Sequence, residues 1–205
     1  MSVIYEDSIL AVCVKPCGVE SEKEFPALMR EKTGGNLFPV HRLDKEAGGI
    51  IVYAKTQRCA AELSAGFASG TVNKKYRVAV EGAPEQSAGT YTDLLFHDRN
   101  RNKTYAVTRE RRGVKRAELE YSVIGSAGGF SLCEILLHTG RTHQIRVQFA
   151  SRKMPVAGDR RYGSHRDCHL ALWSFGIGFT HPETGERMEF ECPPPDEYPW
   201  VLFDK

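Results

Sequence analysis

The stretch Gly140-Arg141-Thr142-His143-Gln144-Ile145-Arg146-Val147 places several polar side chains at the start of an apolar segment. Ile145 and Phe149 are four residues apart, a spacing that puts two side chains on one face of a helix. Thr142 is a residue type that caps helix N-termini. We therefore expect a helix from Thr142 to about Ser151.

The polar side chains of this stretch suit an anionic ligand. Free N–H groups and the helix dipole favour an anion at a helix N-terminus, so Arg141 and His143 are candidates for phosphate binding. Arg146 lies between two apolar residues, where burial is costly unless a carboxylate pairs with it. Asp44 is a candidate partner. Alternatively, Arg146 is exposed, with its aliphatic stem lying along the surface.

A second motif, His41-Arg42-Leu43-Asp44, precedes Gly48-Gly49 and the apolar run Ile50 to Ala54. This run is typical of a buried strand, so the motif is expected in the loop that enters it. An aspartate in such a loop can act as a nucleophile or a base. The alternative is a surface turn closed by an Arg–Asp pair.

Two further segments attract attention. Tyr76 opens an alternating apolar and polar run that ends at Gly82, which predicts a strand. Pro155 to Gly163 is a turn rich in Gly and Arg. Considered separately, the tyrosine is typical of a sheet or core position, and the turn is typical of a solvated loop.

The periodicity along the chain predicts more strands than helices. Helices are expected at 27–33 and 57–69, the second capped by Gly70. Strands are expected at 3–5, 9–15, 50–54, 76–80, 117–123 and 131–137, with two more flanking the turn 181–185. This pattern predicts an α+β fold with a mixed, largely antiparallel central sheet and flanking helices and loops. No linker is evident, so residues 1–205 are expected to form a single domain.

The net charge of +2 hides an uneven distribution. Residues 99–166 contain fifteen bases and five acids, whereas both ends of the chain are acidic. Such asymmetry indicates a polyanionic partner. The alternative is an ordinary solvated charged face.

Several classes of protein are excluded or disfavoured by what the sequence lacks. The longest run without Asp, Glu, Lys or Arg is Cys168 to Pro182, shorter than the roughly 20 residues of a bilayer span. The N-terminus resembles no signal peptide, so a cytoplasmic protein is expected. The six cysteines show no C-x-x-C spacing, and no nucleotide-binding or zinc-protease motif occurs. We therefore expect neither a metal nor a cofactor.

Taken in order, the four segments resemble the RluA-type RNA pseudouridine synthases. Members of that family carry H-R-L-D, a strand of the type Tyr-x-x-x-Val-x-Gly, then G-R-[ST]-H-Q-[IL]-R-V and Pro-x-x-Gly-Asp-x-x-Tyr-Gly. These blocks stand here at 41–44, 76–82, 140–147 and 155–163. The resemblance extends over about residues 3 to 195.

The resemblance implies the pseudouridine synthase fold, with the active-site cleft across the sheet, and conversion of uridine to pseudouridine in RNA. Asp44 would be the essential carboxylate, attacking C1′ or taking the 2′ proton. Arg146 would hold Asp44 ionised, and Tyr76 would stack on the target base. Arg42 would fill the space left by a flipped-out base. The residues expected to contact RNA are His41, Arg42, Arg141, Thr142, His143, Gln144, Arg160 and Tyr162.

The resemblance has departures and leaves alternatives open. Ala47-Gly48-Gly49 stands where the family has Thr-Ser-Gly or similar, and Gln148 stands where it often has His. Ribosomal RNA and transfer RNA are both possible substrates, and a monomer without an appended N-terminal RNA-binding module is expected. A catalytically silent RNA-binding module is one alternative. A metal-dependent hydrolase that uses His41, His143, His165 or His169 with Asp44 or Asp159 is another.

Overall fold

The computed structural model describes residues 2–203. Contacts divide the chain into two compact units that are interleaved in sequence. The first comprises residues 1–74 and 173–194, and the second comprises residues 75–172 and 195–205.

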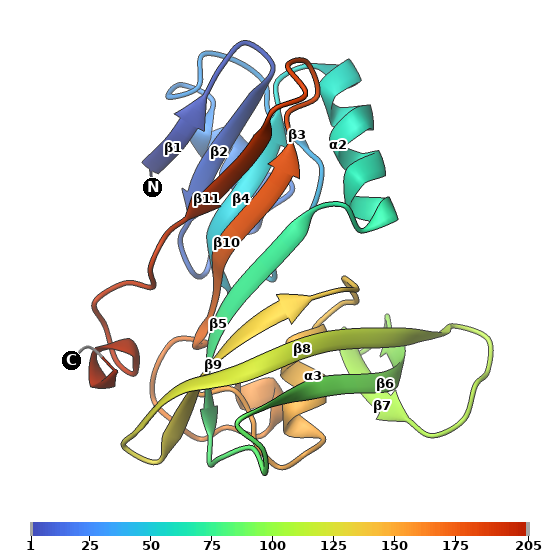
Figure 1. The fold of residues 1–205 in the computed structure, drawn as a ribbon, viewed down its shortest axis with the longest axis vertical. Coiled ribbons are helices and arrows are strands. Elements are labelled where there is room, and N and C mark those ends of the chain that lie inside the picture. Colours follow the sequence, from blue (N-terminus) through green and yellow to red (C-terminus); the bar gives the residue numbers. More distant parts are fainter. Residues whose placement is uncertain (1, 204–205) are drawn as a thin grey trace. The chain divides into compact units, whose positions relative to one another are not determined.

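The first unit carries strands in the order β1-β2-β4-β10. These are β1 (Ser2–Glu6), β2 (Leu10–Lys15), β4 (Gly48–Ala54) and β10 (Leu172–Thr180), as Figure 1 shows. Two short strands complete the unit: β11 (Arg187–Glu191) pairs with β10, and β3 (Phe38–Pro39) pairs with β4. The pairing of β4 with β10 is parallel and all the others are antiparallel.

Two helices belong to this unit, α1 (Glu24–Met29) and α2 (Gln57–Ser69). The side chain of Thr56 caps α2 by accepting a hydrogen bond from Cys59 N, and Gly70 ends it in the left-handed conformation. Cys59 and Leu63 of α2 pack into a core formed by apolar residues of β2, β4 and β10. Burial of this apolar surface is what stabilises the unit.

The second unit carries an antiparallel sheet in the order β5-β9-β8-β6-β7. Its strands are β5 (Asn73–Glu81), β6 (Ala88–Asp98), β7 (Lys103–Val107), β8 (Val114–Ala127) and β9 (Phe130–Leu137). It also contains α3 (Gln144–Ala150), η1 (Arg160–Tyr162) and η2 (Trp200–Leu202).

One face of this second sheet is covered by α3. Phe149 of α3 lies against the rings of Tyr91 and Tyr121, with ring centroids 5.2 and 6.0 Å away. Tyr121 pairs with Ile135, which in turn pairs with Tyr76. Because directly paired residues point to the same face of a sheet, Tyr76 lies on the face that α3 covers.

The predicted fold class is confirmed: the strands outnumber the helices and the sheet is mixed but largely antiparallel. The bounds predicted for 57–69 and the two late strands around 181–185 agree with the structure. The first helix lies at 24–29, not 27–33, and its side chains Phe25 and Met29 are fully buried.

Three strands, β3, β6 and β7, were missed and one helix cap was wrong. Strands β6 and β7 have little apolar alternation, since both are largely half-buried and carry charged residues. Helix α3 starts at Gln144, and Thr142 does not cap it. The residue before the helix is His143, whose φ of 54° is left-handed.

Further sequence-level expectations concern cysteines and membranes. All six cysteines are free, and Cys13, Cys59 and Cys133 are buried. None of the helices within residues 2–203 combines the length and hydrophobicity that a membrane crossing requires.

Two turns in the first unit are held together by Asp7 and His181. Asp7 accepts hydrogen bonds from the backbone N–H groups of Ile9 and Leu10 and pairs with Nε2 of His181 at 2.8 Å. Nδ1 of His181 accepts from the N–H of Thr184, so Nε2 carries the proton. Burial raises the pKa of Asp7, but the hydrogen bonds outweigh it and bring the pKa down to about 2.

Because the pKa of Asp7 is lowered in the folded state, the free energy of unfolding should decrease at low pH. A carboxyl whose folded pKa is depressed stabilises the fold above its unfolded pKa and loses that contribution as pH falls toward the folded value. We expect Asp7 to contribute about 1–2 kcal/mol at pH 6, lost between about pH 4 and pH 2. Denaturant unfolding at several pH values measures this. The decrease in the free energy of unfolding from pH 6 to pH 2 should be smaller in Asp7→Asn than in the native protein.

The matched control is Glu183→Gln at an exposed residue, which should show the same decrease as the native protein. An equal decrease in all three proteins would contradict the role of Asp7.

Candidate active site

Asp44 lies in a tight turn directly before β4. The N–H of Ala47 donates to Asp44 O at 3.0 Å, which closes the turn. The backbone of the preceding residue, Leu43, makes two hydrogen bonds with the side chain of Ser21. The Ser21 hydroxyl donates to Leu43 O and accepts from Leu43 N. These hydrogen bonds hold the Asp44 turn in place. Asp44 is only half-buried, so a ligand can reach its carboxylate.

The buried ammonium group of Lys15 also holds this turn in place. Lys15 is fully buried at the end of β2, and its Nζ donates to the carbonyls of Pro16, Val19 and Lys45. Burial lowers the pKa of Lys15 to about 8. Because Lys45 follows Asp44, this ammonium group binds the backbone at the turn itself.

His41 and Arg42 precede Asp44 and differ in role. Nε2 of His41 accepts from the N–H of Val52, and the ring stacks on Phe67 with centroids 4.3 Å apart. Burial lowers the pKa of His41 to about 3, so this side chain is neutral and anchors the loop. Arg42 is exposed, paired with Glu22 at 3.0 Å, and available to a large ligand.

In the second unit, Tyr76 and Arg146 lie on the same face of the sheet. Tyr76 is 8% exposed in β5, and Arg146 projects from α3, which covers that face. The structure thus places two of the three residues predicted for catalysis on one face of this sheet.

Arg146 is held by Asp159, a partner that the sequence prediction overlooked. Its Nε and Nη2 donate to the two carboxylate oxygens of Asp159 at 2.7 and 2.9 Å. Both side chains are almost completely buried, at 3% and 0% exposed. This two-point geometry suits a buried arginine. The signal was present in the Pro155–Gly163 block, since a buried Arg requires a carboxylate.

A hydrogen-bond network ties the start of α3 to β7. The hydroxyl of Tyr162 donates to Thr104 O and accepts from Thr104 N, and it lies 3.0 Å from Nδ1 of His143. Since the hydroxyl has one proton, Nδ1 of His143 is the donor. The ring of Tyr162 also lies 5.4 Å from the guanidinium carbon of Arg146. Tyr162 and His143 therefore support Arg146 from within the protein.

Gln144, predicted to contact RNA, uses its side chain to hold a loop within the protein. Its side chain is 3% exposed. Its Oε1 accepts from Thr139 Oγ1 and Arg141 N, and its Nε2 donates to Glu118 O. The Gln144 amide thus holds the backbone of the segment that carries Arg141. The Arg141 side chain is held separately, since its Nε donates to Arg116 O.

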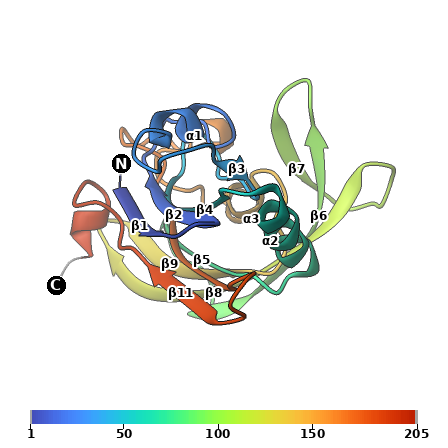
Figure 2. The same cartoon turned by 90° about the horizontal axis from the view of Figure 1, so that it is seen from above.

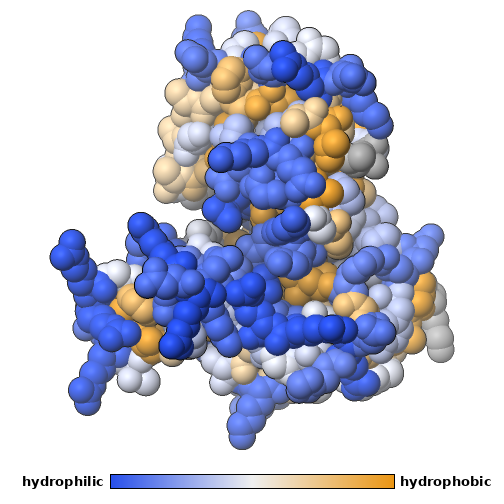
Figure 3. Space-filling view, turned by 180° about the vertical axis from the view of Figure 1, so that it is seen from behind, coloured by the Kyte–Doolittle hydropathy of each residue, from blue (hydrophilic) through white to orange (hydrophobic). Residues whose placement is uncertain are grey.

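The turns around β7 form a basic arm, which we define as residues 99–116. Figure 2 shows the β6–β7 and β7–β8 loops projecting from the rest of the second unit, and Figure 3 shows hydrophilic side chains standing out at the lower left. Arg161 secures the first loop by donating to Arg101 O and Asn102 O. The exposed bases of the arm are Arg99, Arg101, Arg109, Arg111, Arg112, Lys115 and Arg116.

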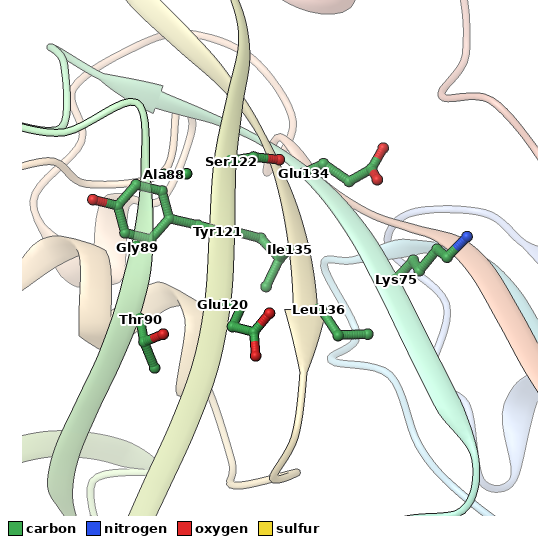
Figure 4. A pocket seen from close by; sticks show the side chains of 10 residues that line it. All are labelled: Lys75, Ala88, Gly89, Thr90, Glu120, Tyr121, Ser122, Glu134, Ile135 and Leu136. Atoms are coloured by element: carbon green, nitrogen blue, oxygen red, sulfur yellow. The ribbon is translucent and has the colours of Figure 1, made fainter.

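The opposite face of the second sheet carries a shallow hollow of about 430 Å³ (Figure 4). Lys75, Glu134 and Leu136 line it, and they alternate along their strands with residues of the Tyr76 face. Glu120 lines it as well and pairs with His138 at 2.8 Å. Two carboxylates make this hollow unsuitable for a phosphate backbone. Within residues 2–203, no group of three His, Cys, Asp or Glu side chains has the geometry of a metal site.

Comparison with known proteins decides the family. The family described as RNA pseudouridylate synthase matches residues 9–151, well over half of the chain. The chain belongs to the RNA pseudouridylate synthase family. It is therefore an RNA pseudouridine synthase, an isomerase of the RluA type.

Relatives of this pseudouridine synthase agree over most of its length. It is 32% identical to "Ribosomal large subunit pseudouridine synthase D" of Zymomonas mobilis, over 96% of this chain and 70% of that protein. It is 33% identical to an uncharacterised RNA pseudouridine synthase of Aquifex aeolicus, over 97% and 71%. The structure of human RNA pseudouridylate synthase domain containing 1 has the same fold, with a TM-score of 0.82 at 22% identity over 95% and 83%.

Proposed function

We propose that this pseudouridine synthase isomerises uridines in ribosomal RNA or transfer RNA with Asp44 as its catalytic carboxylate. The C1′–N1 bond of the uridine breaks and a C1′–C5 bond forms, while C5 releases a proton and N1 gains one. No atom or electron is exchanged with a further reactant, so the isomerisation balances without a cofactor or metal. The rigid Asp44 turn, held by Ser21 and the Lys15 ammonium, is the observation that carries this proposal.

The three predicted catalytic residues would act on one uridine. The ionised Asp44 either attacks C1′ or takes the 2′ proton. Arg146, already oriented by Asp159, supplies a fixed positive charge to the reaction. Tyr76 stacks on the base. Both units then serve one catalytic domain, residues 1–205.

RNA contacts follow from exposure and charge. Arg42 occupies the space of the flipped-out base, while Arg141, Thr142 and Arg160 contact the surrounding RNA and His41 anchors the loop that carries Arg42. His143 and Tyr162 contribute by shaping the site. The relatives named for the ribosomal large subunit support ribosomal RNA as the first substrate to test. We place the enzyme in the cytoplasm as a monomer.

The reaction is tested by release of tritium from C5 of uridine. Transcripts of large-subunit ribosomal RNA and of transfer RNAs, labelled with tritium at C5, would be incubated with the protein in EDTA. We expect tritium to appear in water, and mapping of the modified uridine to name the substrate. Tight RNA binding without release would favour a silent binding module. Activity that EDTA abolishes would contradict chemistry without a metal.

The basic arm predicts that RNA affinity falls steeply with salt. Neutralising six or more phosphates makes affinity fall about 10³-fold or more between 50 and 200 mM salt. Replacing Arg109 and Arg112 together by alanine should reduce the slope of log Kd against log salt by about two. The matched control is Arg58→Ala on α2, an exposed arginine paired with Glu62, which should leave the slope unchanged. An equal slope in all proteins would remove the arm from the RNA interface.

A further inference from the structure

Gly48, four residues after Asp44, lies in contact with the indole of Trp173. Gly48 and Trp173 are partners in the parallel pairing of β4 with β10. A methyl group added at Gly48 would overlap Cζ3 of Trp173 and would lie 2.8 Å from its Cε3. Real Cβ atoms do not approach that closely, so the indole occupies the space that a side chain at residue 48 would need.

The indole is fixed in this position. Trp173 is 6% exposed, and its Nε1 donates to Cys192 O at 3.0 Å. Its neighbour Ser174 pairs with Gly49, whose φ of 113° is left-handed and whose added Cβ would overlap Ser174 O. The indole of Trp173 and the backbone of Ser174 are both held in place, so a side chain at residue 48 or 49 would have no room. This is why β4 begins with Gly48 and Gly49.

The same turn is held from its other side by Lys15. The Lys15 ammonium binds Lys45 O, and Lys15 O lies 3.1 Å from the Cβ position of Gly48. The segment from Asp44 to Gly48 is therefore confined between the end of β2 and the indole. A movement of the ring would be transmitted to the Asp44 carboxylate through only four residues.

We propose that Trp173 is a positioning residue for Asp44: the indole, seated on Gly48, sets where the carboxylate meets the ribose. This inference rests on the proposed role of Asp44. It predicts that residues 48 and 173 are coupled, so that a side chain gained at one requires a smaller side chain at the other.

The test compares Gly48→Ala, Trp173→Leu and the double variant by tritium release, RNA affinity and thermal unfolding. In Gly48→Ala we expect kcat to fall at least tenfold, since a small misplacement of a reacting group costs that much or more, while the Kd for RNA stays within twofold. In the double variant we expect kcat to recover most of the loss. A fall in RNA affinity equal to that in kcat would indicate a merely structural defect and would overturn the proposal.

Gly49→Ala is the matched control. Its added Cβ meets the Ser174 backbone rather than the indole, so Trp173→Leu should not rescue it. Native kcat in Gly48→Ala, or a folded double variant no more active than Gly48→Ala, would overturn the proposal. If the double variant does not fold, the kcat and Kd of Gly48→Ala decide the matter. A native protein that releases no tritium would instead refute the proposed reaction.

Discussion

Asp44→Asn is expected to stop tritium release almost completely, with kcat lower by about 10³-fold or more. The amide is nearly the same size, so the turn closed by Ala47 N and the contacts of Leu43 with Ser21 should persist. The amide can neither attack C1′ nor take a proton from the ribose. RNA affinity should therefore change little while chemistry is lost, and both are measured on the same labelled transcript.

Glu46→Gln is the control for this change. It also removes one negative charge from the turn, but from an exposed side chain two residues beyond Asp44. We expect its kcat to stay within twofold of the native value. Full activity in Asp44→Asn would remove Asp44 from the mechanism, and equal losses in both variants would indicate that only the charge of the turn matters.

Asp159→Asn is expected to have the second largest effect, on both stability and catalysis. Removing one charge of a buried pair leaves the other uncompensated, at a cost of about 3–5 kcal/mol. Arg146 and Asp159 are nearly inaccessible to water, so no solvent replaces the lost partner. Urea unfolding should show this loss, and any protein that remains folded should have kcat reduced about 10²-fold because Arg146 is no longer oriented.

The pair Arg160–Asp167 provides the matched control for that experiment. Its atoms are 3.1 Å apart, but its side chains are 77% and 98% exposed. Exposed pairs contribute about 0–1 kcal/mol. Asp167→Asn should therefore leave stability and kcat near native values. A similar small effect of Asp159→Asn would show that the buried pair does not hold Arg146.

Sequence reasoning succeeded where the signal is local. The helix at 57–69 was predicted with its bounds because its apolar residues and Gly70, which ends it, are local signals. Strands β6 and β7 were not predicted because their side chains are mostly half-buried. Their sequences therefore do not alternate clearly between apolar and polar residues. The sequence also did not show that the Gln144 amide binds Thr139, Arg141 and Glu118, because a polar residue in a motif does not show where its amide points.

By itself, the sequence determined the family, the reaction and the uneven charge of this protein, since ordered motifs and composition can be counted along the chain. Only the tertiary structure decided that Arg146 is held by Asp159 and that Trp173 is seated on Gly48. The physical reason is that burial creates these requirements. A guanidinium enclosed by α3 needs a carboxylate, and an indole brought in by β10 leaves no room for a side chain at residue 48.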